Sequence, residues 1–205
     1  FPGGFPGDFI AQTLEDSNIQ SDFVQVDEDT RINVKLKSGQ ETEINAPGPK
    51  VTHAQFEQLL SQIRRTTNDD IVIVAGSVPN SIPSDAYAQI AQITEKTGAQ
   101  LVVDAEKDLV ETVLPYRPLF IKPNKDELEV MFNTTVKSDE DVIKYGKEIL
   151  KKGAQSVIIS LGGDGAIYVD QHQSIKAVNP QGHVVNTVGS GDSTVAGMVA
   201  GLSMG

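Results

Sequence analysis

The spacing of apolar positions changes about a quarter of the way along this chain. Before that point, residues 8–19 place apolar side chains at helical intervals and predict a short helix. Residues 23–26, 31–36 and 41–45 alternate apolar with polar positions or are rich in β-branched side chains, which predicts strands. The last two are expected to pair through a turn at residues 38–40, so this opening part is predicted to be a helix and a polar hairpin.

In the rest of the chain, apolar strands alternate with amphipathic helices. Strands are expected at residues 70–77, 100–104, 119–122, 155–163, 166–170 and 174–178. Helices are expected at 52–65, 84–97, around 109, at 125–132, at 138–152 and from about 191. Strands that are apolar on both faces form a parallel sheet covered by helices. The sequence thus predicts an α/β fold, with residues 24–44 as an excursion from its layers.

Composition narrows the classes of function. The 205 residues contain no cysteine, which excludes disulfides and thiolate chemistry and leads us to expect a cytoplasmic protein. The formal net charge is −11 and the basic side chains are scattered, so no nucleic-acid partner is expected. No apolar run approaches the roughly 20 residues of a membrane span. Small anionic substrates remain compatible, because a few cations and backbone amides suffice to hold a phosphate.

Four short motifs follow predicted strands. They are GSVP, KPNKDE, SLGGDG and GSGD, at residues 76–79, 122–127, 160–165 and 189–192. In parallel α/β sheets, ligands bind beyond the carboxyl ends of the strands. The four motifs are therefore expected to line one ligand cleft.

The last motif places an acidic residue among glycines at the start of a helix. Gly189 and Gly191 permit a close approach of the backbone, and the amides of residues 189–192 would face an anion at the helix N-terminus. Asp192 would gain about 0.3–1 kcal/mol from the helix dipole as a simple cap. It would equally serve as a base that takes a proton from a bound hydroxyl. The spacing alone leaves both roles open.

Three other glycine motifs do not fit this loop. A Walker loop needs lysine where Asp192 stands, and the dinucleotide fingerprint needs glycine where Thr194 stands. A serine-hydrolase elbow needs glycine at both flanking positions of Ser193. A nicotinamide-dependent enzyme and a serine hydrolase are accordingly disfavoured.

The segment NTVGSGDSTVAG at residues 186–197, with KPNKDE and SLGGDGA upstream in this order, resembles the ribokinase-like carbohydrate kinases, the phosphofructokinase-B family. The resemblance covers essentially the whole chain. It implies a three-layer α/β/α fold with a mostly parallel central sheet and a small β-sheet lid at about residues 22–47. The family's opening sugar-binding motifs and closing nucleotide segments are not found, so residues 1–205 are expected to form one kinase domain that is incomplete at both ends.

The resemblance also implies catalytic roles. Asp192 corresponds to the base that deprotonates the acceptor hydroxyl. Gly189, Ser190 and Gly191 correspond to the amides that stabilise the transferring phosphoryl group. A carboxylate would then meet the acceptor hydroxyl at the place where backbone amides meet the phosphate.

Nucleotide and metal contacts are implied in the same way. Asn124 and Glu127 correspond to the family's magnesium-associated pair, which suits an ion that prefers a few oxygen ligands together with ATP phosphates. The nucleotide-binding residues implied by the resemblance are Lys122, Asn124, Ser160, Gly162, Gly163 and Gly165. Without the resemblance, KPNKDE is equally typical of a turn before an acidic helix start, and GGDG of a hairpin turn.

On the sugar side, Arg31 corresponds to the family's phosphate-binding arginine and Ser77 to a sugar-phosphate contact. A guanidinium suits a phosphate because its donors form a planar fork. Without the resemblance, Arg31 is equally well an exposed edge-strand arginine and Ser77 an ordinary turn residue.

The activity implied is transfer of a phosphoryl group from ATP, with Mg²⁺, to the 6-hydroxyl of fructose 1-phosphate. Tagatose 6-phosphate is the alternative acceptor, and a non-catalytic sugar-phosphate-binding module is the alternative of another class. The expected partners are therefore a small sugar phosphate and ATP, with no membrane. The resemblance also implies a homodimer that forms through the lid.

Overall fold

The computed structural model describes residues 1–38 and 40–204. Two compact units make up the chain, Phe1–Arg65 with Val78–Ala86 and Thr66–Ser77 with Tyr87–Gly205. We call them the first and the second unit. Within the described residues, no helix is both long enough and apolar enough to cross a membrane.

The first unit contains two helices and a hairpin. They are α1 (Gly4–Asp16), β1 (Val34–Ser38), β2 (Gln40–Ile44) and α2 (His53–Ile63). Helix α2 begins in a capping box, in which Thr52 Oγ1 accepts from the Gln55 N–H and Gln55 Oε1 accepts from the Thr52 N–H. Phe56, Leu60 and Ile63 form its buried face, which confirms the helical spacing predicted there.

Two predictions for this unit need correction. Residues 23–26 form no strand. Val24 and Val26 are buried, and the Val26 N–H donates to the carbonyl of Pro2 at 3.0 Å. The alternation of apolar and polar residues therefore arises from a loop with two buried valines. Helix α1 ends before the predicted residue 19, because Asn18 adopts a left-handed conformation with φ 55°.

The predicted hairpin is present, with β1 and β2 antiparallel and Val34 opposite Ile44. Its predicted turn at 38–40 includes Gly39, which lies outside the described residues. Strand β1 begins at Val34, so Arg31 lies in the loop before the strand instead of starting it.

The second unit holds a six-stranded sheet in the order β3-β4-β5-β6-β7-β8. The strands are β3 (Ile71–Ala75), β4 (Gln100–Asp104), β5 (Phe120–Ile121), β6 (Ser156–Ser160), β7 (Ala166–Asp170) and β8 (Ser174–Ala177). Strands β3 to β6 are parallel, whereas β7 and β8 pair antiparallel. The connection from β6 to β7 is too short for the crossover of about a dozen residues that parallel pairing needs. The mostly parallel sheet predicted from the apolar strands is confirmed.

Helices lie between and after these strands. They are α3 (Ala86–Thr97), α4 (Lys107–Val113), the 3₁₀ turn η1 (Leu114–Tyr116), α5 (Lys125–Phe132), α6 (Asp139–Lys152), the 3₁₀ turn η2 (Gly162–Asp164) and α7 (Ser190–Met204). Ser138 caps α6 by accepting from the Asp141 N–H at 3.3 Å. Acidic residues in the first turn of α6 and lysines in its last turn complement the helix dipole.

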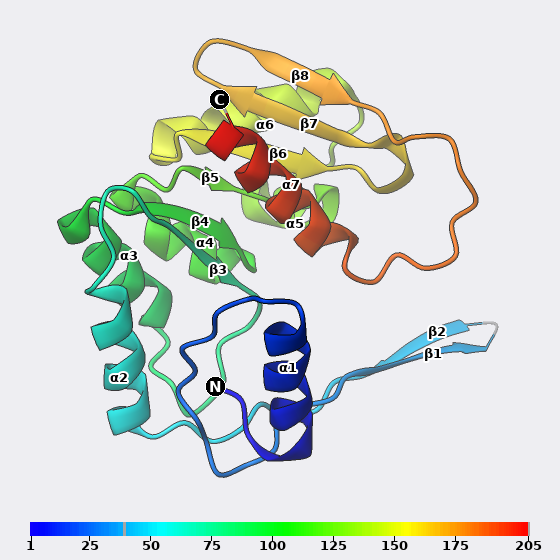
Figure 1. Cartoon of the computed structure of the whole chain (residues 1–205). Coiled ribbons are helices and arrows are strands. Elements are labelled where there is room, and N and C mark those ends of the chain that lie inside the picture. Colours follow the sequence, from blue (N-terminus) through cyan, green and yellow to red (C-terminus); the bar gives the residue numbers. More distant parts are fainter. Residues whose placement is uncertain (39, 205) are drawn as a thin grey trace. The chain divides into compact units, whose positions relative to one another are not determined.

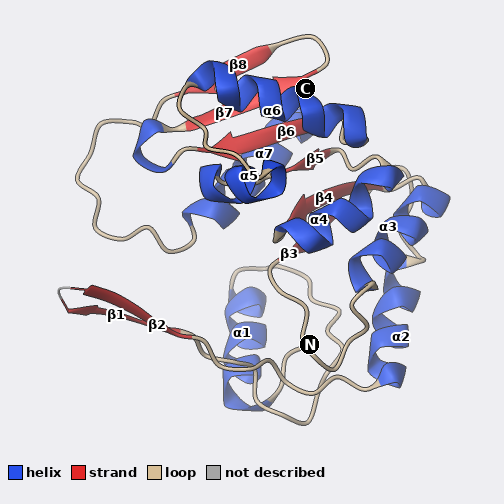
Figure 2. Ribbon diagram, turned by 180° about the vertical axis from the view of Figure 1, so that it is seen from behind, coloured by secondary structure: helices blue, strands red, loops and turns tan. Residues whose placement is uncertain are grey.

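Helices cover both faces of this sheet. Figure 1 shows α7 across one face, where Val195 of α7 packs in one cluster with Ile158 of β6. Figure 2, seen from behind, shows α6 over the opposite face. There a Cβ atom on Gly146 of α6 would lie 3.3 Å from side-chain atoms of Val157 and Ile159. Neighbouring residues of one strand point to opposite faces, so β6 is buried between two helical layers, as the α/β/α prediction requires.

Candidate active site

A cavity of about 870 Å³ lies beyond the carboxyl ends of β5 and β6 in the second unit. Its walls include eight residues predicted for the site, namely Lys122, Asn124, Ser160, Gly162, Gly163, Gly165, Ser190 and Gly191. The volume falls within the roughly 300–1,000 Å³ of small-molecule and cofactor sites. The fold therefore brings three motifs that are distant in the sequence to one place.

The start of α7 forms one wall of the cavity. The helix follows Gly189, whose φ of 78° is left-handed. The Ser190 N–H donates to the carbonyl of Thr187 at 3.2 Å and is thus engaged in the turn. Within the described parts of the chain, no acceptor is found for the N–H groups of Gly191 and Asp192. These two donors lie at the positive end of the helix dipole, where an anion is stabilised.

An ion pair lies beside this helix start. Lys122 follows β5 and Asp104 ends β4, and Lys122 Nζ is 3.1 Å from Asp104 Oδ1. The side chains are 7% and 18% exposed. Removing one partner from such a pair would leave a charge desolvated and uncompensated. The pair therefore holds the ammonium group at the cavity wall.

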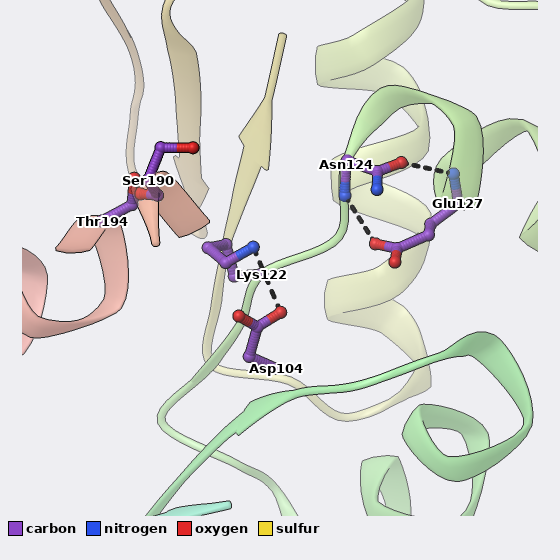
Figure 3. A network of polar contacts seen from close by, with 6 residues as sticks. All are labelled: Asp104, Lys122, Asn124, Glu127, Ser190 and Thr194. Carbon is purple, nitrogen blue, oxygen red and sulfur yellow. Dashed lines mark hydrogen bonds and ion pairs between the residues drawn. The ribbon is translucent and has the colours of Figure 1, made fainter. Parts of the chain in front are cut away.

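Helix α7 packs directly on that ion pair. A Cβ atom on Gly191 would lie 3.4 Å from Lys122 Nζ and 3.9 Å from Asp104 Oδ2. Figure 3 shows Ser190 and Thr194 on the α7 side of the lysine, where Thr194 Oγ1 donates to the Ser190 carbonyl at 2.8 Å. A cation and helix N–H donors thus face the same small region.

Asn124 and Glu127 form a reciprocal cap at the start of α5 (Figure 3). The Asn124 N–H donates to Glu127 Oε2 at 2.7 Å, and the Glu127 N–H donates to Asn124 Oδ1 at 2.8 Å. Burial raises the pKa of the Glu127 carboxyl above its ordinary value, although the Asn124 N–H and the Lys122 ammonium oppose the rise. The residues predicted as a turn before an acidic helix start therefore include the pair predicted to accompany magnesium, and Asn124 and Glu127 form one capping box.

A glycine turn at residues 162–165 also lines the cavity. Gly162 is left-handed, with φ 59°, and neither Gly162 nor Gly163 has an atom within 4 Å of a Cβ position. The Asn179 side chain donates to the Gly162 carbonyl at 2.9 Å and holds the turn from the loop after β8. Bare backbone is therefore presented to the cavity.

Other predicted residues lie outside the cavity walls. Gly189 precedes α7, and Asp192 is exposed in the first turn of α7, directly after the lining residue Gly191. Glu127 is half-buried behind Asn124, and Ser77 is exposed after β3. Arg31 is exposed in the first unit.

Sequence reasoning missed Asp104. The apolar pattern predicts the strand at 100–104 but does not mark its last residue as part of the site. The signal was present, because an acidic residue that ends an apolar strand is costly to bury without a partner. What the sequence does not state is that β5 is the neighbour of β4 and brings Lys122 to it.

The chemistry of these donors fits a nucleotide with its magnesium ion better than a metal held by protein alone. Within residues 1–38 and 40–204, no group of three or more His, Cys, Asp or Glu residues could hold an ion. Magnesium bound with ATP commonly takes one or two side-chain oxygens and completes its shell with phosphates and water. Asn124 and Glu127 could supply such oxygens, and Lys122 with the α7 donors could take the phosphates.

Comparison with known proteins shows to which family this chain belongs. The sequence model of pfkB family carbohydrate kinases matches residues 1–205. The chain belongs to the pfkB family. As a member, it is a phosphotransferase that acts on a carbohydrate, and its six-stranded sheet with helices on both faces is the ribokinase-like fold that the motifs implied.

Several known proteins are similar in sequence to this chain over nearly its whole length. It is 42% identical over 203 residues to the 1-phosphofructokinase of Bacillus subtilis, which aligns 99% of this chain with 67% of that protein. It is 36% identical over 206 residues to the D-tagatose-1-phosphate kinase of Bacillus licheniformis, covering 100% of this chain and 68% of that protein. A crystal structure from Staphylococcus aureus, of a protein assigned as a phosphofructokinase, is 78% identical with a TM-score of 0.88 and covers 100% of this chain and 67% of its own. The chain thus spans about two thirds of these relatives.

Proposed function

We propose that this chain carries the phosphoryl-transfer site of a 1-phosphofructokinase, which uses ATP to phosphorylate the 6-hydroxyl of fructose 1-phosphate. The observation that carries the proposal is the convergence of the Lys122 ammonium, the N–H donors of Gly191 and Asp192 and the glycine turn at 162–165 around one cavity. The 42% identity to a 1-phosphofructokinase supports the choice of sugar.

On the nucleotide side, the cavity would take the triphosphate of ATP. Positive charge at Lys122 and the α7 donors would stabilise the negative charge that spreads over the transferring group. Mg²⁺, held near Asn124 and Glu127, would supply neutralisation of the phosphate oxygens. Glu127 Oε2 is engaged by the cap, so this carboxylate would offer its other oxygen, Oε1.

On the acceptor side, Asp192 would take the proton of the 6-hydroxyl. The hydroxyl oxygen would then form its bond to the γ-phosphorus while the bond from that phosphorus to the ADP oxygen breaks. Support comes from the position of Asp192, which is one residue beyond the Gly191 donor and is exposed.

The rest of the substrate contacts belong to this proposal as well. Arg31 and Ser77 would bind the phosphate of the sugar, and residues 22–47 would act as the lid of one kinase domain. The hairpin leaves Val34, Leu36 and Ile44 about half exposed, which supports pairing of two lids in a homodimer. The cytoplasmic location stays a prediction.

A second sugar must be considered because of one relative. The 36% identity to a D-tagatose-1-phosphate kinase makes tagatose 1-phosphate the competing acceptor, ahead of the tagatose 6-phosphate expected at first. Steady-state kinetics of the full-length protein with all three sugar phosphates and ATP would test this. We expect the highest kcat/KM for fructose 1-phosphate. A higher value for either tagatose phosphate would replace the substrate, and binding without turnover of any of them would favour a non-catalytic module.

A further inference from the structure

Tyr87 lies in the first turn of α3 and is buried, with 6% of its surface exposed. Its hydroxyl donates to the carbonyl of Gly76 at 2.8 Å. Gly76 directly follows β3, and its own N–H donates to the carbonyl of Asp104 at 2.9 Å. Both backbone polar groups of Gly76 are therefore hydrogen-bonded, the N–H to the end of β4 and the carbonyl to the tyrosine.

The turn at Gly76 depends on such support. Its φ is 86°, a left-handed value, and nothing lies within 4 Å of its Cβ position. No contact at the Cβ position restrains this turn, whereas the two hydrogen bonds of Gly76 do. The next residue is Ser77, so the direction of the Gly76 turn decides where Ser77 lies.

The tyrosine is suited to donate throughout the physiological pH range. Burial, together with the nearby negative charge of Asp104, raises the pKa of Tyr87 to about 12. The phenol therefore keeps its proton and remains a donor to the Gly76 carbonyl. A phenylalanine at this position would preserve the buried ring and remove only that donor.

We infer that Tyr87 is a positioning residue for the acceptor side of the site: it fixes the Gly76 turn at the end of β3 and thereby places Ser77 against the sugar phosphate. The inference rests on the proposed function, because Ser77 meets the acceptor only in such a kinase. It assigns to Tyr87 an effect on acceptor binding and none on ATP binding.

Replacing Tyr87 in the full-length protein tests this. Y87F is expected to raise KM for fructose 1-phosphate by about fivefold, the size of one lost hydrogen bond. KM for ATP and kcat are expected to stay within about twofold, since a uniform binding contact is lost. A merely structural role would lower the active fraction and leave both KM values unchanged.

Tyr145 provides the matched control. Its hydroxyl shares a 3.0 Å hydrogen bond with Thr134 Oγ1, and its ring lies on α6, away from the end of β3. Y145F should leave both KM values unchanged. Equal changes in the two variants, or a Y87F variant whose KM for the sugar is unaltered, would overturn the inference.

Hydrogen exchange separates this inference from the proposed function. If the wild-type protein turns over none of the sugar phosphates, the proposed function fails, yet the support of the turn is still measurable. Exchange of the backbone amides of residues 75–78 is then expected to accelerate in Y87F and not in Y145F. Unchanged exchange in Y87F would show that the tyrosine does not hold the turn.

Discussion

The cavity of the second unit has two walls that are built differently. One, the backbone wall, consists of the glycine turn within residues 160–165 together with Ser190 and Gly191, and presents peptide groups and glycines. The other, the side-chain wall, is lined by Lys122 and Asn124, which pair with Asp104 and Glu127 outside the lining.

The two walls respond differently to substitution for a physical reason. In the backbone wall, the donors are main-chain N–H groups, so a side-chain change there acts mainly through conformation, and the acidic side chain of interest is Asp192, which directly follows Gly191. In the side-chain wall, each group depends on a partner, Lys122 on Asp104 of the neighbouring strand and Asn124 on Glu127 within one capping box. Loss of one partner is therefore costly in stability as well as in binding.

The largest effect is expected beside the backbone wall, at Asp192, which directly follows Gly191. D192N should lower kcat by about 10²–10⁴-fold, because the amide cannot take the acceptor proton, while ATP affinity stays nearly unchanged. Steady-state kinetics and ATP titration measure the two effects. D108N removes an exposed acidic side chain from the first turn of α4. It should leave turnover within about twofold, because only the favourable interaction of this carboxylate with the helix dipole is lost. Similar losses in both variants would point to a capping role for Asp192.

The side-chain wall should show the largest effect on stability. D104A leaves the buried Lys122 ammonium without its partner, so the free energy of unfolding should fall by about 3–5 kcal/mol. Denaturant unfolding measures it. E148A breaks the 2.7 Å pair with Lys151, whose side chains are 42% and 71% exposed, and should cost less than about 1 kcal/mol. If the two costs were equal, burial would not be what distinguishes this wall.

Substitution of two neighbouring glycines in the backbone wall distinguishes the cost of a left-handed backbone from the effect of adding a side chain in open space. G162A places a side chain at a left-handed φ of 59° and should lower the free energy of unfolding by about 1–2 kcal/mol. At Gly163 the φ is not left-handed and the surroundings are equally open, so G163A should leave stability unchanged and weaken only ATP binding. Thermal unfolding with ATP titration checks both, and equal destabilisation would argue against backbone strain at Gly162.

A small and pH-dependent effect on stability is expected at Glu127. Its folded-state pKa is raised by burial, so the folded protein binds this proton more tightly and loses stability as pH rises from the ordinary glutamate pKa through the raised one. E127Q keeps the capping geometry and removes this loss, so above that window it should be at least as stable as the wild type. Activity should nevertheless fall by about 10–100-fold if the carboxylate supports the metal.

For E127Q, unfolding curves across the acid and neutral pH range and kinetics at varied Mg²⁺ give the two readouts. A parallel loss of stability and activity would show that Glu127 serves the helix cap alone.

Much of the fold could be predicted because its signals are local. The strands at 100–104 and 166–170 and the helix at 125–132 lie where the apolar spacing placed them. The prediction failed at 23–26, where buried valines in a loop imitate a strand. The glycine motifs likewise gave the backbone wall, since turns and helix starts are encoded within a few residues.

The sequence by itself determined which segments are strands and helices, and which short motifs leave backbone donors exposed. The tertiary structure alone decided that Asp104 pairs with Lys122 and that Tyr87 holds Gly76. Spacing and turn chemistry act between residues close in the chain, whereas these contacts depend on which strand lies next to which. That order follows from the packing of the whole sheet between its helical layers, and no local pattern records it.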